Sequence, residues 1–591
     1  MPQPTQPSTP SSMQPPAISS EPTNALLQRI RDGVIGQYTP IETPFGTRPL
    51  VYADYTASGR SLDFIESQLW DSVLPYYANT HSESSFTGAQ STALREQARR
   101  TIAHALNLDA HDRLIFCGAG ATAAINLLVD ILNLRLPREL DERYGFSEQI
   151  PEEQRPAVFV GPYEHHSNEL PWRESIADVI RIPLDAQGHI DQLALADALH
   201  DYRHRPLKIG SFSAASNVTG LRSDVQAITR LLKREGALAF WDYAAAAPYV
   251  AIDMNGGDAP IDALFLSPHK FIGGPGTPGI LVLKEQLFSS PVPARVGGGT
   301  VSYVTPTSHH YLEDHERREE GGTPAIVESV RAGLVFALQQ RVGTARIEDI
   351  EQTKVKAVFH GLSPLENLEI LGPQDAPRLA IFSLRFHHAP DRELHYGFVV
   401  ALLSDLFGIQ ARGGCSCAGP YGHALLAIDA QRSERLEHWT TTRYGCLRPG
   451  WVRLNFNYFL AEGEFAYLLK ALSLVAEHGW RLLPSYALDT ATGLWRHRSA
   501  VARAAPGLLE ARLDAEVHNT PVQQPDFQVL IQTAEATLLR SPAREHISAA
   551  LTENALQGEA EDLRWFLSGR EAAMKLRDTV DLNSTGPGAY S

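Results

Sequence analysis

Between about residues 51 and 300, short apolar runs alternate with helical stretches, and this alternation constrains the fold more than any other feature. Most runs are followed by glycine, proline or a polar cluster, and helical sequence such as Ser223–Glu235 separates several of them. Such alternation is typical of a parallel sheet covered by helices, so we predict an α/β fold. The predicted strands are Arg113–Cys117, Ala157–Gly161, Leu207–Phe212, Ala237–Trp241 and Ala263–Ser267.

The 591 residues are enough for several domains. The first residues are rich in Pro, Ser, Thr and Gln and carry no apolar stretch, which predicts a disordered tail. Strand candidates at 379–386 and 451–458 indicate a second unit, and Ala, Leu, Glu and Arg predominate after Trp480. We therefore predict a disordered tail (1–23), a large domain with an N-terminal segment (24–345), a small domain (346–480) and a helical C-terminal extension (481–591).

Composition excludes several classes of protein. The formal net charge of −16 argues against nucleic-acid binding, because surfaces that bind phosphate backbones are usually basic. No run approaches the roughly 18–20 apolar residues of a membrane-spanning helix, so we expect no membrane association. The four cysteines are too few for a disulfide framework in so long a chain. Reduced thiols in the cytoplasm are the expectation.

The first predicted strand leads into Gly118-Ala-Gly-Ala-Thr122. In open α/β sheets, ligands bind beyond the carboxyl ends of the strands. Small residues at the start of a helix allow backbone N–H groups to approach an anion, here with Ala121 and Thr122 as donors to a phosphate. A glycine turn of this kind also joins strands to helices where no ligand binds. No Gly-x-Gly-x-x-Gly follows the first strand, which argues against a dinucleotide site.

Two adjacent histidines, His165 and His166, follow the second predicted strand. Neighbours in sequence rarely point at the same ion, and no H-E-x-x-H or C-x-x-C set accompanies them, so we predict no metal site. A His165 ring that covers a flat aromatic cofactor fits better. A pair of surface histidines is the alternative.

The next three strands end at polar residues that complete a pattern. Asn217 lies in a turn after the third strand, Asp242 follows the fourth, and Ser267-Pro-His-Lys270 follows the fifth. An Asp and a Lys at successive strand ends suit pyridoxal 5′-phosphate (PLP): the carboxylate would keep the pyridine nitrogen protonated and the amine would bind covalently. A lysine in a solvated turn is the alternative, but the full order of anion loop, His, Asn, Asp and Lys favours the cofactor.

From about residue 50 to 475 the chain resembles the class-V, fold-type I PLP enzymes, most of all the cysteine desulfurase and selenocysteine lyase group. Besides the strand-end residues, the resemblance rests on Val51–Arg60, Asn79–His81, Gly299-Thr300 and Glu320–Pro324. It implies a mostly parallel, seven-stranded-type sheet in the large domain, a smaller α+β domain and a homodimer.

The resemblance also implies roles for individual residues. His165 would stack on the pyridine ring, Asn217 would approach the phenolic oxygen, Asp242 the ring nitrogen and Lys270 the aldehyde carbon. Thr300 would contribute a phosphate contact to the neighbouring subunit. Arg453 would bind the substrate carboxylate with its planar guanidinium. The phosphate would be held by Ala121, Thr122, Ser267 and His269, and the remaining substrate-side residues would be Ala57, Ser58, His81 and Arg412.

Sulfur chemistry is implied by Arg412-Gly-Gly-Cys-Ser-Cys-Ala-Gly-Pro420, which places Cys417 at the position of the family's sulfur-accepting cysteine. Its thiolate would attack the substrate's sulfur and leave alanine and an enzyme persulfide, while Lys270 moves protons. A sulfur-acceptor protein would then be a partner. The alternatives are that Cys415 and Cys417 are merely small loop residues, or a metal clip, which lacks two further ligands nearby.

Two positions depart from the family pattern. Ala245 stands where the family carries a glutamine that bonds the phenolic oxygen, and Cys415 stands where the nearest relatives have a histidine. Either change is compatible with a different substrate. The alternatives to cleavage of cysteine or selenocysteine are an epimerase, lyase or aminotransferase that acts on another amino acid, and a PLP-binding scaffold protein.

Overall fold

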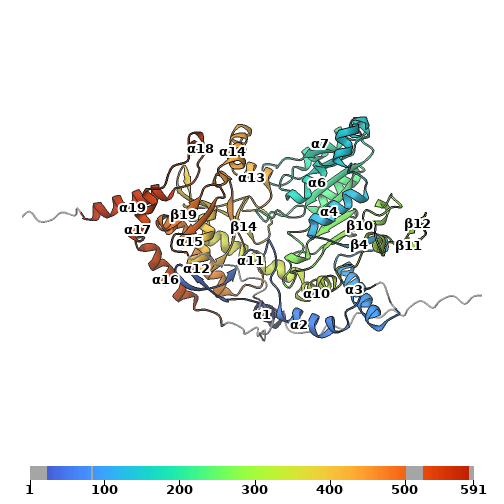
Figure 1. Cartoon of the computed structure of the whole chain (residues 1–591), viewed down its shortest axis with the longest axis horizontal. Coiled ribbons are helices and arrows are strands. Elements are labelled where there is room, and N and C mark those ends of the chain that lie inside the picture. The colour runs from blue at the N-terminus through green and yellow to red at the C-terminus, as the bar shows by residue number, and fades with distance from the viewer. Residues whose placement is uncertain (1–22, 81–83, 501–522, 585–591) are drawn as a thin grey trace, which may run out of the picture.

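The computed structural model describes residues 23–80, 84–500 and 523–584. Figure 1 shows a large α/β unit on the right, a smaller unit in the middle and the C-terminal helices on the left. Nearly all of the predicted N-terminal tail lies outside the described residues, as does His81.

A seven-stranded sheet forms the centre of the large unit, in the order β4-β10-β9-β8-β7-β5-β6. Only β10 runs antiparallel to its neighbours, β4 and β9, and every other pairing in this sheet is parallel. Each predicted apolar run forms one of the strands, so the predicted mostly parallel α/β sheet is confirmed. The strands are β4 (Asp112–Cys117), β5 (Ala157–Val160), β6 (Asp178–Arg181), β7 (Lys208–Ser213), β8 (Leu238–Asp242), β9 (Ala263–Leu266) and β10 (Gly279–Lys284).

Both faces of this sheet are buried, which explains why its strands read as continuous apolar runs. In β5, for example, Phe159 packs into the core on one face and Val160 into the core on the other. Each fully buried side chain of this size contributes about 1.5–3 kcal/mol to stability. One face is covered by α4 (Gly120–Ile131) and α6 (Leu170–Arg173), the other by α3 (Phe86–Ala105), α7 (Gln192–Asp201), α8 (Val225–Arg234) and α10 (Ile326–Val342).

The small unit contains an antiparallel sheet in the order β13-β14-β18-β17, with β15 paired to β14. The sequence candidates at 379–386 and 451–458 correspond to β14 and β18. The strands are β13 (Leu368–Ile370), β14 (Ile381–Ala389), β15 (Arg392–Glu393), β17 (Arg412–Gly414) and β18 (Trp451–Asn455). The helices are α11 (Thr344–Leu362), α12 (Tyr396–Phe407), α13 (Gly419–Leu425), α14 (Ala430–Thr442) and α15 (Glu462–His478).

Two elements connect the large and small units. Helix α11 places Ile347 in the core of the large unit and Val358 in that of the small unit. Strand β3 (Val51–Tyr52), from the N-terminal segment, pairs in parallel with β16 (Ile409–Gln410). The substrate-side segment that follows β3 is therefore fixed to the small unit. The N-terminal segment also contains α1 (Thr23–Gly33), β1 (Pro40–Thr43), β2 (Gly46–Pro49) and α2 (Asp63–Ser72).

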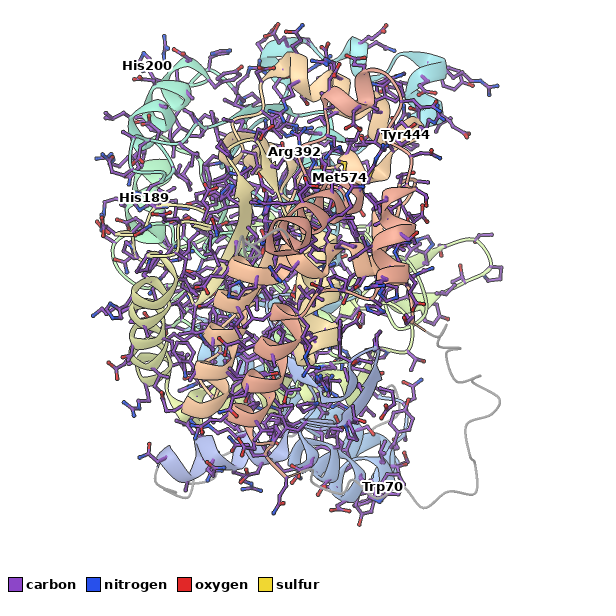
Figure 2. The ribbon with its side chains drawn as sticks, turned by 90° about the vertical axis from the view of Figure 1, so that its left-hand side faces the viewer. Trp70, His189, His200, Arg392, Tyr444 and Met574 are labelled. Carbon is purple, nitrogen blue, oxygen red and sulfur yellow. The ribbon has the colours of Figure 1, made fainter. Side chains whose placement is uncertain are left out.

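The C-terminal extension shares the core of the small unit through Phe527, Leu538, Leu563 and Phe566. Figure 2 shows the face that carries Met574 of the extension and Arg392 of β15, whose Nε lies 3.9 Å from Glu571 Oε1 of the extension. Contrary to the helical expectation, it begins with a β-hairpin around an Asp-Thr-Ala-Thr-Gly turn, and exposed and buried residues alternate in its second strand. Its elements are β19 (Tyr486–Asp489), β20 (Leu494–His497), α16 (Phe527–Leu539), α17 (Arg544–Leu551), α18 (Glu559–Asp562) and α19 (Gly569–Ser584).

Across the described residues, none of the helices has the length and apolar character required to cross a membrane.

Candidate active site

The carboxyl ends of β5, β7, β8 and β9 border a cavity of about 210 Å³ between the two units. The structure brings most of the sequence-predicted residues to its walls: Ala57, Ala121, Thr122, His165, Asn217, Asp242, Ser267, His269, Lys270, Arg412, Cys417 and Arg453. Residues from the two units thus share one small space.

Lys270 and Asp242 form the floor of the cavity. Lys270 ends a short 3-10 turn after β9, and Asp242 is the last residue of β8 and is buried. Burial lowers the pKa of Lys270 to about 8, although the Asp242 carboxylate acts in the opposite direction. Burial also raises the pKa of Asp242, while the Ala244 N–H, 2.8 Å from its Oδ1, and the Lys270 charge oppose that rise.

His165 follows β5 and is the third residue of this floor. Its Nδ1 accepts a hydrogen bond from the Ser167 backbone N–H at 3.1 Å, which leaves the ring proton on Nε2. Burial, and then the Lys270 charge, lower the pKa of His165 to about 3. The ring is therefore a neutral, oriented imidazole at physiological pH.

Small and hydroxyl-bearing residues surround the start of α4. Ser267 Oγ lies 2.8 Å from the Ala121 N–H, and the Thr122 and Ser167 hydroxyls are 2.6 Å apart. Gly120 has a φ of +57°, and a Cβ there would lie 2.8 Å from Ser267 Oγ. This position therefore requires glycine both for its backbone conformation and for its space. The result is a cluster of donors at the positive end of a helix, which suits a phosphate.

Arg453 lies on the substrate side and is almost fully buried. Its Nη2 donates to Asp54 Oδ1 at 2.9 Å and its Nη1 to the Asn217 carbonyl oxygen at 3.2 Å. Within the described chain its buried Nε has no hydrogen-bond partner. One edge of the guanidinium therefore retains capacity to bind a carboxylate.

The cysteine pair lies in a tight turn. Ser416 and Cys417 both have positive φ, +55° and +56°, and the Ala418 N–H donates to the Cys415 carbonyl oxygen at 3.2 Å. Cys417 is exposed and lines the cavity, whereas Cys415 is partly buried and packs against the core of the large unit. The two thiols therefore occupy different surroundings.

Hydrogen bonds from both units hold this turn in its conformation. Asn217 Nδ2 donates to the Ser416 carbonyl oxygen at 2.8 Å, and Trp451 Nε1 donates to Ser416 Oγ at 3.2 Å. His166 binds the turn twice: its N–H donates to the Cys417 carbonyl oxygen at 2.8 Å, and its Nε2 accepts from the Gly419 N–H at 3.0 Å. Two adjacent non-glycine residues with positive φ need such compensation.

Some predicted residues lie apart from the cavity. Ser58 is not among the residues that line it; its Oγ donates to the His269 carbonyl oxygen at 3.1 Å and lies 3.2 Å from His269 Nδ1. Thr300 is buried and donates to the Gly297 carbonyl oxygen at 2.7 Å, away from the cavity of its own chain.

Ala245, in contrast, lines the cavity. Its methyl side chain supplies no hydrogen-bond donor there, where the family carries a glutamine.

Asp54 and Ser167 are site residues to which the sequence interpretation gave no role. A buried arginine at 453 requires a counter-charge, and Asp54 is the carboxylate in the matching Val51–Arg60 segment, so this pairing had a signal in the sequence. Ser167 stands two residues after His165, but its contact with Thr122 joins two segments far apart in the sequence. Only the folded chain shows that contact.

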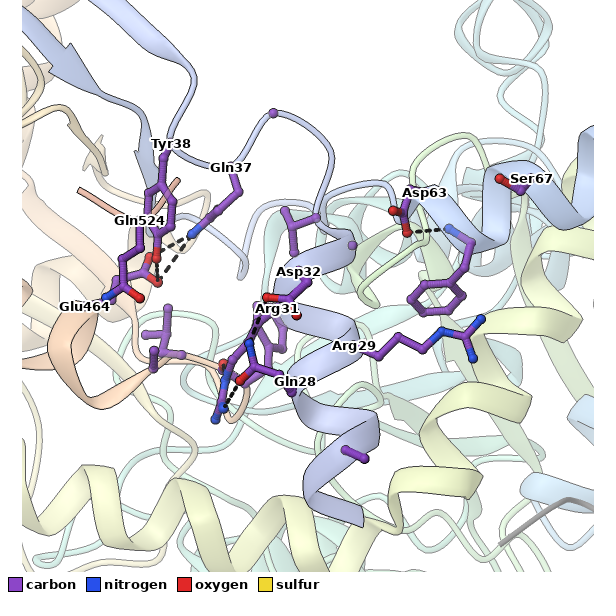
Figure 3. A pocket seen from close by; sticks show the side chains of 18 of the residues that line it. Gln28, Arg29, Arg31, Asp32, Gln37, Tyr38, Asp63, Ser67, Glu464 and Gln524 are labelled. Carbon is purple, nitrogen blue, oxygen red and sulfur yellow. Dashed lines mark hydrogen bonds between the residues drawn. The ribbon is translucent and has the colours of Figure 1, made fainter. Parts of the chain in front are cut away.

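A larger cavity of about 1100 Å³ lies between α1, α2 and the start of α15, as Figure 3 shows. The buried Glu464 carboxylate accepts hydrogen bonds there from Gln37 Nε2 at 3.1 Å and Tyr38 OH at 2.9 Å. The residues of the described chain that line it include no lysine, histidine or cysteine. The smaller cavity is therefore the candidate active site.

Comparison with known families identifies the fold and the family. The class-V aminotransferase model matches residues 51–432. The chain belongs to the class-V aminotransferase family. Among relatives, a probable cysteine desulfurase of Halalkalibacterium halodurans is 28% identical over 381 residues, which is 63% of this chain and 85% of the relative. A cysteine desulfurase of Klebsiella pneumoniae is 27% identical over 377 residues, with the same two coverages.

Solved structures of this family share the fold. A cysteine desulfurase from Thermococcus onnurineus superimposes with a TM-score of 0.58 at 23% identity, over 72% of this chain and 95% of the other. The corresponding values for the Escherichia coli cysteine desulfurase CsdA are 0.55 and 20%, over 72% and 94%. The predicted fold-type I architecture is confirmed. The class-V family match ends at residue 432, so Arg453 and the extension lie beyond it.

Proposed function

We propose that this protein cleaves the C–S bond of cysteine, or the C–Se bond of selenocysteine, with PLP as cofactor, to give alanine and a persulfide on Cys417. The observation that carries the proposal is that Cys417 enters from the small unit the same 210 Å³ cavity that Lys270, Asp242 and His165 line from the large unit. The similarity to cysteine desulfurases supports this substrate class.

The residues present fit PLP. The buried Asp242 carboxylate has a backbone partner on Oδ1 only and suits a protonated pyridine nitrogen. The neutral His165 ring suits stacking, and the donor cluster at Gly120–Thr122 with Ser267 suits a phosphate. When bound, the cofactor supplies an electron sink for the bond cleavage at the substrate carbon.

Lys270 and Arg453 would prepare the substrate. With a pKa of about 8, the Lys270 amine is close to the point where it accepts and releases protons near neutral pH, so it can remove the Cα proton and return a proton. The free edge of Arg453 would hold the substrate carboxylate, with Asp54 fixing the guanidinium on its other side. This orientation presents the substrate side chain to the exposed Cys417.

Cys417 would carry out the sulfur transfer. Its thiolate attacks the substrate sulfur, an S–S bond forms and the Cβ–S bond breaks. The electron pair of the broken bond remains with the carbon fragment and is finally protonated as the methyl group of alanine. The transferred sulfur is oxidised as Cβ is reduced, so the step needs no external oxidant. Because Cys417 is exposed, a sulfur-acceptor protein can reach the persulfide.

A homodimer fits the exposed surface of the single chain. Trp70, Tyr76, Tyr77 and Phe86 are exposed around α2 and the start of α3, and Trp70 projects at the bottom of Figure 2. Clustered exposed aromatic side chains mark interaction surfaces. The free cysteines fit the reducing cytoplasm.

The test is a screen of amino acids with the purified protein, added PLP and a thiol reductant, with identification of the products. Cysteine or selenocysteine should give alanine together with sulfide or selenide in equal amounts. Formation of pyruvate and ammonia, of the other enantiomer or of a keto acid, without alanine, would contradict the proposal and indicate a different amino-acid reaction.

A further inference from the structure

One short segment of the C-terminal extension, Leu563–Ser568, joins the edge of the small sheet. The Leu567 N–H donates to the Glu393 carbonyl oxygen at 2.8 Å, and the Glu393 N–H donates to the Trp565 carbonyl oxygen at 3.2 Å. Phe566 pairs with Glu393 as a parallel bridge and is buried. The main chain at Trp565 is therefore fixed immediately beside the beginning of α12.

The Trp565 side chain continues this contact as a stack of rings. Its indole lies 5.2 Å from the His395 ring at an interplanar angle of 18°, and 6.1 Å from the Tyr396 ring at 20°. Its Nε1 donates to the Leu447 carbonyl oxygen at 3.2 Å. His395 is held in turn, because its Nδ1 accepts from the Gly397 N–H at 2.9 Å and its Nε2 lies 3.1 Å from the Cys446 carbonyl oxygen.

The Tyr396 ring packs in turn against β17, the strand that leads into the cysteine turn. A Cβ added at Gly413 would lie 2.7 Å from Tyr396 Cδ2, and one added at Gly450 would lie 2.8 Å from Cε1. The ring therefore fills the space that side chains would take at these two glycines. Gly413 belongs to β17, whose first residue, Arg412, lines the cavity and whose last residue precedes Cys415.

The extension also holds the chain after the cysteine turn. Glu559 of α18 pairs with Arg435 of α14 and accepts a hydrogen bond from Trp439 Nε1 at 3.4 Å. In the turn of the β19–β20 hairpin, the Ala491 carbonyl oxygen accepts from the Gly445 N–H at 3.1 Å. The extension thus contacts the small unit on both sides of the turn in the sequence, at β17 through Tyr396 and at α14 directly.

We propose that the C-terminal extension positions the cysteine turn, and that Trp565 is the positioning residue through which it acts on Arg412 and Cys417. Without the indole, the Tyr396 ring has free space behind it, and β17 loses the contact that fixes it on the side of Gly413. Displacement of a nucleophile by about 1 Å lowers the rate of its reaction about 100-fold. The expected effect on the reaction rests on the proposed function. The position of Cys417 can be measured independently of that function.

The experiment compares three variants of the full-length, PLP-loaded protein: Trp565→Ala, Trp565→Leu, which keeps apolar volume without the planar stack, and Trp480→Ala as the matched control. Trp480 also connects the small unit and the extension, 5.0 Å from the His388 ring and 4.9 Å from Lys575 Nζ, but it is not part of the Trp565–Tyr396 stack. The first readout is the rate of persulfide formation from cysteine in a single turnover. The second is the rate of Cys417 alkylation by iodoacetamide in the resting protein, followed by peptide mass spectrometry.

Trp565→Ala should slow persulfide formation about 10–100-fold and change the alkylation rate of Cys417, with the visible absorption of the bound cofactor unchanged. Trp565→Leu should show the same changes to a smaller degree, and Trp480→Ala should match the wild type in both readouts. Wild-type rates in a folded Trp565→Ala protein would overturn the proposal. If that variant does not fold, wild-type rates in Trp565→Leu would overturn it. If the wild type forms no persulfide, the proposed function fails, and the alkylation rates still decide whether Trp565 positions the turn.

Discussion

The floor of the cavity and its cysteine turn are built in different ways. Lys270, Asp242 and His165 follow strands of one sheet, so the sheet itself places them at one edge. Cys417 stands in a turn with positive φ whose conformation depends on hydrogen bonds from Asn217 and His166. The first set therefore needs little beyond the sheet, whereas the second needs several tertiary contacts.

The electrostatic environments differ as well. In the floor, burial lowers the pKa of Lys270 and of His165 and raises that of Asp242, so the buried groups there are drawn toward their neutral forms. Cys417 is exposed and is held through its backbone. Changes in the floor should therefore alter cofactor binding and protonation, and changes in the turn should alter sulfur transfer alone.

The largest effect is expected from Lys270→Ala. It removes both the covalent attachment of the cofactor and the group that moves protons, so turnover should fall at least about 100- to 10,000-fold. Borohydride reduction followed by peptide mapping should fix the cofactor on Lys270 in the wild type and on no residue of the variant. A reduced adduct at another lysine would show that the floor is assigned to the wrong residue.

Cys417→Ser should separate the two regions. It should abolish release of sulfide from cysteine yet leave the visible absorption of the bound cofactor intact, because the floor does not depend on the thiol. Mass spectrometry after one turnover without reductant should find the extra sulfur on Cys417.

Cys415→Ser is the matched control for that variant. Cys415 packs against the large unit's core and does not line the cavity, so this change should only slow turnover. If both serine variants released sulfide at the wild-type rate, direct elimination or another reaction would replace the proposed mechanism.

A smaller effect is expected from Asp242→Ala. A hydrogen bond to a charged group contributes about 1.5–3 kcal/mol, so loss of this one at the pyridine nitrogen should lower turnover about 10- to 150-fold. The protein should still bind some cofactor through its other contacts. Asp242→Asn keeps the size and removes the charge. Wild-type turnover in Asp242→Asn would show that the carboxylate does not set the protonation of the ring.

The smallest effect concerns pH. Only the neutral Lys270 amine can bind the cofactor covalently, so the rate of PLP incorporation into the apoprotein should rise with pH and level off above the pKa of about 8. An unperturbed lysine would give a rate that still rises beyond about pH 10. Because the Asp242 carboxylate raises the pKa of Lys270, Asp242→Asn should move the midpoint to lower pH. A midpoint that stays near the ordinary lysine pKa would contradict the buried environment of the amine.

The sequence is sufficient to predict the sheet and the residues at its strand ends. An apolar run predicts a buried strand, and the polar residues after it predict the side chains at the carboxyl end of that strand. For this reason the pattern alone places Asp242 and Lys270 at one edge of the sheet. The hairpin at 486–497 is missed because its strands are only four residues long and carry no alternation of polar and apolar residues. The different surroundings of Cys415 and Cys417 depend on a turn held by residues far away in the sequence. No local pattern reports on such contacts.

The late pairings of this fold have a consequence for its synthesis on the ribosome. The Ala121 N–H meets Ser267 Oγ across 146 positions, and Asp54 meets Arg453 across 399. At about 5–20 residues per second, about 7–30 s pass between the synthesis of Ala121 and that of Ser267. The Asp54–Arg453 pair waits longer still. The nascent chain therefore contains all of its cofactor-side residues once Lys270 has been added, in the first half of translation, whereas the substrate-side pair forms only after Arg453 has been added.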